Sequence, residues 1–185
     1  MPESGPMNRL SRGFRGMSSA VIIVIAVLAV GAASLFAASL TSRRPAGLGV
    51  HNDRLAACPS SPNCVSTQAE DREHWIRPID TEHADPLAVI RQILQQLPRV
   101  TIVSDTDTYL HAEFRSRLFR FPDDVEFFCV PDTGRIHFRS ASRLGHSDLG
   151  VNRARMEQIR ERFLQAVSGQ SATATNPDGK VVTAG

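Results

Sequence analysis

The chain has little of what usually marks an enzyme. Its 185 residues include three cysteines, one Trp and one Tyr, and they contain no phosphate-binding glycine-rich loop, no Cys-x-x-Cys motif, no internal repeat and no heptad pattern. No motif therefore fixes a reaction, and no interface pattern fixes an oligomeric state. We predict no catalytic residue, no cofactor and no metal site.

The excess of basic residues is small and lies outside the main body of the chain. The formal net charge is +2, from 21 Lys and Arg against 19 Asp and Glu. From Pro45 to Val167 there are 15 Arg against 17 acidic residues, a net charge of −2, so this part has no basic face for nucleic acid. We expect no nucleic-acid partner. Arginines instead flank one apolar segment, at Arg9, Arg12, Arg15, Arg43 and Arg44.

That apolar segment runs from Met17 to Leu40 without a charged residue. As an α-helix it would be about 36 Å long, against roughly 30 Å for the hydrocarbon core of a bilayer. A buried core helix would need a larger protein around it. A cleaved signal peptide stays open as an alternative because small residues lie near the end of the segment, although the apolar run is longer than is typical of such a peptide. We predict an uncleaved transmembrane anchor over residues 17–40.

The flanking arginines indicate the topology. Three precede the apolar segment and two follow it, so the positive-inside rule places residues 1–16 in the cytoplasm. An anchor and a signal peptide would both deliver everything after Leu40 to the far side of the membrane. We expect a single-pass protein of the bacterial inner membrane with a periplasmic or otherwise extracytoplasmic domain, where disulfides are tolerated.

The remaining chain divides into three parts. Residues 41–57 carry Pro and Gly without a sustained period, and we interpret them as a linker. Residues 58–167 are predicted to form one globular domain. The small polar residues 168–185 are predicted to be a disordered tail, because they offer no apolar face to offset the entropy of ordering.

Within the domain, two amphipathic helices enclose four β-like stretches. The first helix begins at Asp85-Pro86 and ends at Pro98, and the second covers 152–167. The strands cover 101–105, 109–117, 125–130 and 135–140, and the turn sequences Asp-Thr-Asp-Thr, Pro-Asp-Asp and Pro-Asp-Thr-Gly separate them. Residues 75–78 add an edge strand. The predicted fold is α+β: an antiparallel sheet of four to five strands with two helices on one face, in the order β-α-β-β-β-β-α, preceded by the transmembrane helix.

Strand alternation divides the side chains of this sheet between two faces. The predicted core face carries Leu110, Ala112, Phe114, Leu118, Val125, Phe127, Cys129, Ile136 and Phe138. We interpret Cys129 as an inert buried thiol. The opposite, polar face carries Tyr109, His111, Glu113, Arg115, Arg117, Glu126, Phe128, Val130, His137 and Arg139.

Three interpretations of the polar face stay open. It could be a solvated face with cross-strand ion pairs of little energetic value. It could be a binding surface, because apolar residues lie beside the charges. It could also hold a general acid and base, if His111 or His137 pairs with Glu113 or Glu126.

The two cysteines of Cys58-Pro-Ser-Ser-Pro-Asn-Cys64 lie around two prolines. A disulfide suits the predicted compartment, and closing so short a loop stabilises a fold by roughly 2.4 kcal/mol through chain entropy. Zinc would need His51 or His74 to complete its ligands, and a redox-active pair lacks the usual spacing. Two free thiols in a turn are the last alternative. We predict the disulfide.

Arginines are dense between Glu113 and Arg153. Pairing with neighbouring carboxylates is one interpretation. The other is an anion site where Arg139, Arg143 and Arg153 meet the start of the last helix, whose free N–H groups favour a phosphate, a carboxylate or a lipid headgroup. The candidate ligand-binding residues are His111, Glu113, Arg115, Arg117, Glu126, His137, Arg139, Arg143 and Arg153.

Several extended strings resemble an uncharacterised bacterial family, domain of unknown function 1499. They are the Cys58–Cys64 loop with the following Val-Ser, the stretch Tyr109–Phe121, Asp-Asp-Val-Glu-Phe from Asp123, and the stretch Ile136–Arg153. The resemblance covers about Cys58 to Val167 and departs at Thr67, where many members have a second Ser. It implies a secreted or membrane-tethered domain, with relatives in photosynthetic organisms, and no established activity, so no catalytic residue is carried over.

Two functional hypotheses follow. The first is a non-enzymatic envelope module that binds a partner protein, an anionic small molecule or a lipid headgroup through the polar face or the arginine-rich loop. The second is a hydrolase or thiol-redox enzyme that uses the His/Glu face or the Cys58/Cys64 pair.

Overall fold

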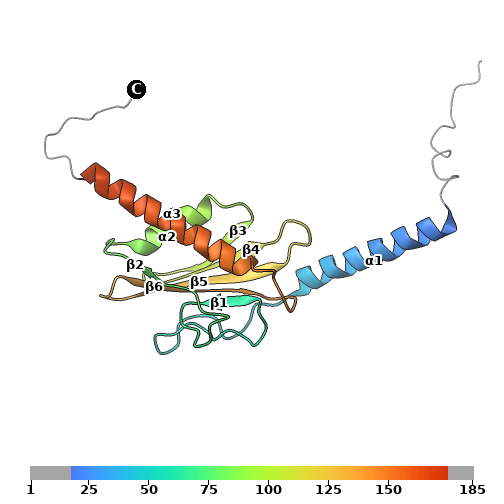
Figure 1. Ribbon diagram of the computed structural model, residues 1–185, viewed down its shortest axis with the longest axis horizontal. Coiled ribbons are helices and arrows are strands. Elements are labelled where there is room, and N and C mark those ends of the chain that lie inside the picture. Colours follow the sequence, from blue (N-terminus) through green and yellow to red (C-terminus); the bar gives the residue numbers. More distant parts are fainter. Residues whose placement is uncertain (1–17, 175–185) are drawn as a thin grey trace, which may run out of the picture.

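A computed structural model describes residues 18–174 of the chain, with side chains as far as Gly169. Helix α1, Ser19–Thr41, projects away from an α+β domain formed by the later residues (Figure 1). Residues 1–16, predicted to be cytoplasmic, lie outside the described part of the chain.

The sheet has six strands, and every pairing in it is antiparallel. The strand order is β1-β6-β5-β4-β3, and β2 pairs with the same edge of β6 as β1 does. The bounds are β1 Cys64–Ser66, β2 Ile79–Asp80, β3 Val100–Asp105, β4 Tyr109–Arg115, β5 Pro122–Val130 and β6 Arg135–Ser142.

Helices α2, Pro86–Gln95, and α3, Val151–Ala174, lie together on one face of the sheet (Figure 1). Helix α2 begins as its sequence indicates: the Asp85 side chain accepts a hydrogen bond from the Ala88 amide, and Pro86 occupies the first turn. The α+β class, the antiparallel sheet and the preceding apolar helix are therefore confirmed.

The hydrophobic core lies between this helical layer and the sheet. Apolar residues at helical spacing on α2 and α3 meet alternating residues of β4, β5 and β6. The most deeply buried of them are Leu87, Ile90 and Leu94 of α2, Met156, Ile159 and Phe163 of α3, and Leu110, Phe127, Ile136 and Phe138 of the sheet. Cys129 packs against this core but is only partly buried.

The structure corrects the predicted turn between the two central strands. Strand β4 ends at Arg115, and the chain turns over residues 116–121 with Arg120 in the left-handed region at φ 59°. Leu118, predicted to face the core, is 76% exposed in this turn. Strand β5 already begins at Pro122, because Pro is tolerated as the first residue of a strand. The Pro-Asp-Asp sequence is thus strand, not turn.

The edge of the sheet also differs from the prediction. The edge strand is Ile79–Asp80, just after the predicted 75–78, and Trp75 makes only an isolated bridge with Ser66. Strand β1 was not predicted. It begins at Cys64, the last residue of the disulfide loop, and pairs with β6.

The predicted linker 41–57 is packed for part of its length. The segment passes across the sheet face opposite the helices, where the Gly49 amide donates to Glu126 Oε1 at 2.7 Å. The Leu55 side chain is buried, and its amide donates to Gln68 Oε1 at 2.8 Å. This segment therefore covers the sheet face that sequence alternation marks as polar.

Helix α3 continues to Ala174, beyond the predicted end at Val167. Residues 168–174 of the predicted tail are thus helical; extending an existing helix costs far less than nucleating one, and no proline lies between Pro131 and Pro177. The rest of the predicted tail, 175–185, lies outside the described residues.

Candidate functional site: a buried polar cluster on the sheet

Alternation along β4, β5 and β6 collects charged side chains on the sheet face that the N-terminal segment crosses. We call this group the polar cluster: Tyr109, His111, Glu113, Arg115, Asp124, Glu126, Arg139 and Arg143. Several of its members are buried, and Glu126 is 0% exposed. The interpretation of a solvated face is therefore wrong at its centre.

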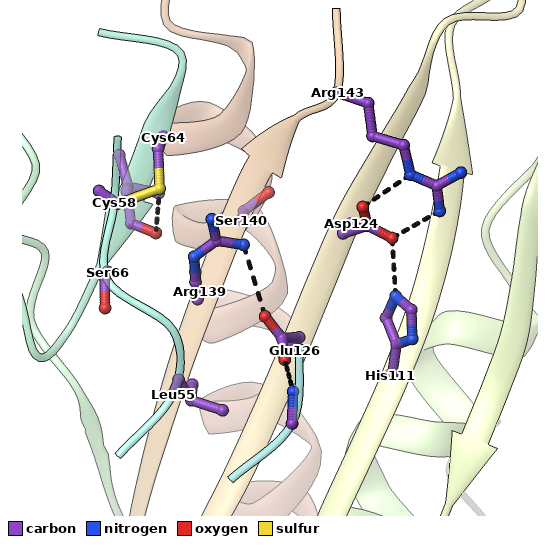
Figure 2. Close-up of polar contacts among 12 residues, drawn as sticks. Leu55, Cys58, Cys64, Ser66, His111, Asp124, Glu126, Arg139, Ser140 and Arg143 are labelled. Atoms are coloured by element: carbon purple, nitrogen blue, oxygen red, sulfur yellow. Dashed lines mark hydrogen bonds and ion pairs between the residues drawn. A yellow bond between two sulfur atoms is a disulfide. The ribbon is translucent and has the colours of Figure 1, made fainter. Parts of the chain in front are cut away.

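Asp124 is the centre of the first half of the cluster (Figure 2). Arg143 donates to both carboxylate oxygens, from Nη2 to Oδ1 at 2.6 Å and from Nε to Oδ2 at 2.7 Å. His111 Nε2 lies 2.8 Å from Oδ1, and the carboxylate accepts this bond too. A bidentate Arg–carboxylate contact is the strongest type of ion pair in proteins.

These contacts set the ionisation of Asp124. Burial by itself would raise the pKa of this carboxyl, but the hydrogen bonds from Arg143 and then His111 outweigh burial and lower the pKa to about 2. Asp124 is therefore a carboxylate at any physiological pH, and it is a poor general base because its charge is already satisfied.

Arg143 also joins Asp124 to the edge of the cluster. Its Nη2 lies 2.7 Å from Glu113 Oε2, and the Arg115 Nη2 lies 2.6 Å from Glu113 Oε1. Two arginines and two carboxylates thus alternate along the ends of β4, β5 and β6, with His111 at the inner end.

Glu126 is the centre of the second half. Its Oε1 accepts from the Tyr109 hydroxyl at 2.8 Å and from the Gly49 amide. Its Oε2 accepts from Arg139 Nη1 at 3.4 Å (Figure 2). Burial and the nearby Glu126 carboxylate raise the pKa of Tyr109. Among the described buried side chains, Arg139 Nε is the one polar atom that lacks a hydrogen-bond partner.

The predicted acid–base pairs are not assembled. His111 contacts Asp124 rather than Glu113 or Glu126, and His137 Nδ1 lies 2.9 Å from the Thr67 hydroxyl. Burial, and then the charge of Arg135, lower the pKa of His137, so this imidazole is neutral near pH 7.

The predicted arginine-rich anion site is not assembled either. Arg139 points to Glu126 and Arg143 to Asp124, whereas Arg153 donates to the carbonyl oxygens of Trp75 and Glu73 at 3.0 and 2.7 Å. The pairing interpretation fits Arg139 and Arg143. The candidate residue Arg117 lies apart from all of them, exposed in the β4–β5 turn.

Cys58 and Cys64 are joined by a disulfide. Asn63, just before Cys64, ties this loop to the start of α3: its carbonyl accepts from Asn152 Nδ2 at 2.9 Å, and its own Nδ2 donates to the Gly145 carbonyl at 2.6 Å. The sequence reasoning missed both asparagines, and a buried Asn, with one carbonyl and one NH₂ to satisfy, has no periodic signal that reveals it.

The two histidines considered as zinc ligands do not form a metal site within residues 18–174, where no group of three ligating side chains occurs. His74 instead bridges Asp71 and the Ser61 carbonyl, at 2.8 and 3.1 Å. Burial would lower its pKa, but the bonds to Ser61 and Asp71 outweigh burial and raise it. His74 thus links Ser61 of the disulfide loop to Asp71.

The largest cavity among the described pockets lies away from the polar cluster. It has a volume of about 770 Å³ and is bounded by the start of α2, the β3–β4 turn and the β5–β6 turn, including His83, Asp85, Asp107 and Cys129. None of its lining residues belongs to the polar cluster, so this cavity does not give substrates access to His111 or Glu126.

Residues 54–163 match the protein family described as a protein of unknown function, DUF1499. The chain belongs to this family. The match includes the disulfide loop, the whole sheet, α2 and most of α3 of the DUF1499 domain, and it leaves out α1. No curated protein matches the chain. The family's description assigns no activity, and the DUF1499 domain is therefore interpreted from its own geometry.

Proposed function

We propose that this chain is a single-pass membrane protein of the bacterial envelope, in which α1 is an uncleaved anchor and the DUF1499 domain is a non-enzymatic binding module outside the cytoplasm. The observation that carries the anchor is exposure: no residue in the most apolar 18-residue window of α1 is buried. Its 23 residues form a helix of about 34 Å, and an apolar surface of that length is stable in a bilayer rather than in water.

The length of α1 supports retention of the helix over cleavage as a signal peptide, because its 23 residues exceed the apolar run of about 7–15 residues that is typical of such a peptide. Ser39, in the last turn of α1, is buried, and its hydroxyl donates to the Arg120 carbonyl at 2.6 Å. This contact lies C-terminal to the small residues Ala33 and Ala38, so it would persist whether or not the chain were cleaved there.

The disulfide supports an extracytoplasmic location, because such bonds persist in oxidising compartments and are rare in the cytosol. Three arginines, Arg9, Arg12 and Arg15, precede the anchor and favour a cytoplasmic N-terminus. Together with the disulfide, they favour a periplasmic domain.

The contacts of the polar cluster support a binding module rather than a hydrolase or thiol-redox enzyme. Its charged groups satisfy one another, and its central carboxylates, Asp124 and Glu126, are buried. The cysteines of the redox alternative are already bonded to each other. A ligand, whether a partner protein or an anionic group, would meet the domain at a surface other than this cluster.

Membrane fractionation with cysteine labelling tests the proposal. The full chain, with Cys129→Ala, is produced in a Gram-negative host as two single-site variants, Ser4→Cys before the anchor and the exposed Gln92→Cys on α2. We expect both to stay in the membrane after alkaline carbonate washing, at the mass of the uncleaved chain. A membrane-impermeant maleimide should label Gln92→Cys in spheroplasts and Ser4→Cys only after lysis.

Release by carbonate, or a mass that lacks α1, would overturn the anchor, and the reverse labelling pattern would overturn the topology. For the compartment, Cys58 and Cys64 should alkylate only after reduction. Hydrolysis by the full chain of any member of a panel of ester and peptide substrates would contradict the non-enzymatic assignment.

A further inference from the structure

We infer that the end of the domain next to α1 rests on the bilayer and binds anionic lipid headgroups. This inference rests on the proposed anchor. The surface concerned, the membrane-proximal end, consists of the β4–β5 turn, residues 116–121, and the β6–α3 loop, residues 143–150.

Topology places both loops at one end of the sheet. Strands β4 and β5 pair Arg115 with Pro122, and β5 and β6 pair Asp123 with Ser142. The end of β4, the start of β5 and the end of β6 therefore lie at one end of the sheet. Helix α1 extends away from this end (Figure 1).

The contact between α1 and the β4–β5 turn fixes the depth of this end. A hydrocarbon core of roughly 30 Å accommodates about 20 helical residues, so Ser39, near the end of the 23-residue helix, lies at its boundary. Because Ser39 donates to the Arg120 carbonyl, the turn lies at the level of the lipid headgroups.

The membrane-proximal end presents apolar side chains to the outside. Leu118 in the turn is 76% exposed and Leu149 in the β6–α3 loop is 94% exposed. Of the described large apolar residues outside α1, these two have the highest exposed fractions. Two exposed leucines on loops that face a bilayer are typical of side chains that insert at the headgroup–acyl boundary.

Positive charge surrounds these leucines. Arg43, Arg44, Arg117 and Arg120 are exposed, and within the described residues none of them forms an ion pair. Of the nearby acidic side chains, Glu113 and Asp123 pair with arginines. Asp148 accepts only from the amides of Gly150 and Asn152 and keeps its charge, but the four unpaired arginines outnumber it. The free charge at this end is basic, which complements anionic lipids.

The β4–β5 turn is held in shape before any contact with lipid. The Ser116 amide donates to the Phe121 carbonyl at 3.0 Å, and the Phe121 amide donates to Ser116 Oγ at 2.9 Å. The rings of Phe119 and Phe121 stack with their centroids 5.5 Å apart. Leu118 therefore projects from a rigid turn, so its insertion requires little further ordering.

Tryptophan reporters in the full chain test the inference. In a Trp75→Phe background, Leu118→Trp and Leu149→Trp are reconstituted into phosphatidylglycerol vesicles with or without brominated acyl chains. The matched control is Leu164→Trp, also exposed but about 20 Å along α3 from its start. We expect brominated lipid to quench the fluorescence of the Leu118→Trp and Leu149→Trp variants at least twofold and to leave the control almost unchanged.

A second arm tests the headgroup charge. With Leu149→Trp as reporter, quenching should fall at least twofold in phosphatidylcholine vesicles, and also in phosphatidylglycerol vesicles when Arg117 and Arg120 are changed to Gln. Equal quenching in both lipids would overturn the selectivity for anionic headgroups.

The outcomes separate this inference from the anchor. Protein that floats with the vesicles while neither reporter is quenched overturns the membrane contact and leaves the anchor standing. Protein that fails to associate with vesicles overturns the anchor. A blue-shifted reporter emission that brominated lipid does not quench would indicate contact with a second copy of the chain, and would also overturn the inference.

Discussion

At the scale of residues, Asp124 shows how a carboxylate is kept inside the domain. Removing its charge from water is costly, and the bidentate contact with Arg143 together with the bond from His111 replaces that hydration. The arrangement depends on both ions, because removing one would leave the other buried with a weaker partner, Glu113 for Arg143 or His111 for Asp124.

Replacing this carboxylate should therefore be severe. We expect Asp124→Asn to lower the free energy of unfolding by about 3 kcal/mol, because it removes both charge-assisted bonds to the buried Arg143, which then keeps only its contact with Glu113. The matched control is Asp105→Asn, whose partner Arg91 lies 2.5 Å away but where both side chains are 32% exposed; we expect a loss below about 1 kcal/mol there. Urea denaturation of the full chain in detergent measures both, and equal losses would contradict the prediction.

The low pKa of Asp124 also predicts acid sensitivity. Its folded pKa of about 2 lies below the ordinary 3.8, so the stabilisation is fully present above about pH 4 and is lost as pH falls toward 2. The size of the effect is about 2 kcal/mol. The unfolding free energy of the wild-type chain, measured from pH 6 to 2.5, should fall more steeply below pH 4 than that of Asp124→Asn. Parallel curves would show that another group dominates.

At the scale of elements, the turn between β5 and β6 depends on a glycine. Gly134 has a φ of +63°, and a Cβ there would lie 2.1 Å from the Thr81 carbonyl oxygen. The Thr81 amide also donates to the Gly134 carbonyl at 2.7 Å, so this close approach holds the chain after β2 against the turn.

Gly134→Ala should lower the free energy of unfolding by more than the strain of a left-handed alanine alone. Gly150 has a φ of +80° but open space around a Cβ, so Gly150→Ala should cost about 1 to 2 kcal/mol. Gly134→Ala adds the clash with Thr81 and should cost at least about 1 kcal/mol more. Thermal and urea unfolding of the two variants measure the difference, and equal stabilities would refute the role of close packing.

The elements also show which sequence signals can be relied on. Asp85-Pro86 and the following apolar period defined α2 because capping and amphipathicity are local properties. Pro122-Asp-Asp resembled a turn by the same local rules, yet it forms the start of β5. Arg155 on α3 donates to Asp123 at 2.5 Å, and Arg143, directly after β6, donates to Asp124. Partners so distant in sequence leave no local signal.

At the scale of the whole molecule, the segment after α1 connects this apolar helix to the sheet. It leaves the helix at Ser42, passes Glu126 through the Gly49 amide and buries Leu55. The polar cluster is thus enclosed by chain that precedes the DUF1499 match or lies at its start.

This enclosure predicts a specific effect of truncating Leu55. Leu55→Ala should lower the unfolding free energy by about 2 kcal/mol through the cavity it leaves, and should speed hydrogen exchange at the Gly49 amide more than tenfold. Leu164→Ala, whose side chain is 48% exposed, should cost below about 1 kcal/mol and leave Gly49 unchanged. Unaltered exchange at Gly49 in Leu55→Ala would show that the segment does not depend on this side chain.

The sequence by itself determined the apolar helix, the two amphipathic helices, the four longer strands β3 to β6 and most of the core face of the sheet. All of these follow from hydrophobic period, caps and turn residues, which act over a few positions. The family resemblance drawn from the extended strings is confirmed over residues 54–163.

Only the tertiary structure decided which contacts the side chains of the polar face make. Its outcome depends on contacts between residues far apart in sequence. These contacts decide which carboxylate accepts the bond from His111, whether Arg139, Arg143 and Arg153 meet, and which segment covers Glu126. Strand alternation assigns a side chain to a face, but it does not say whether water, an ion partner or another segment lies above it. The same reason explains why Leu118, placed in the core by alternation, is instead exposed in the turn that contacts the end of α1.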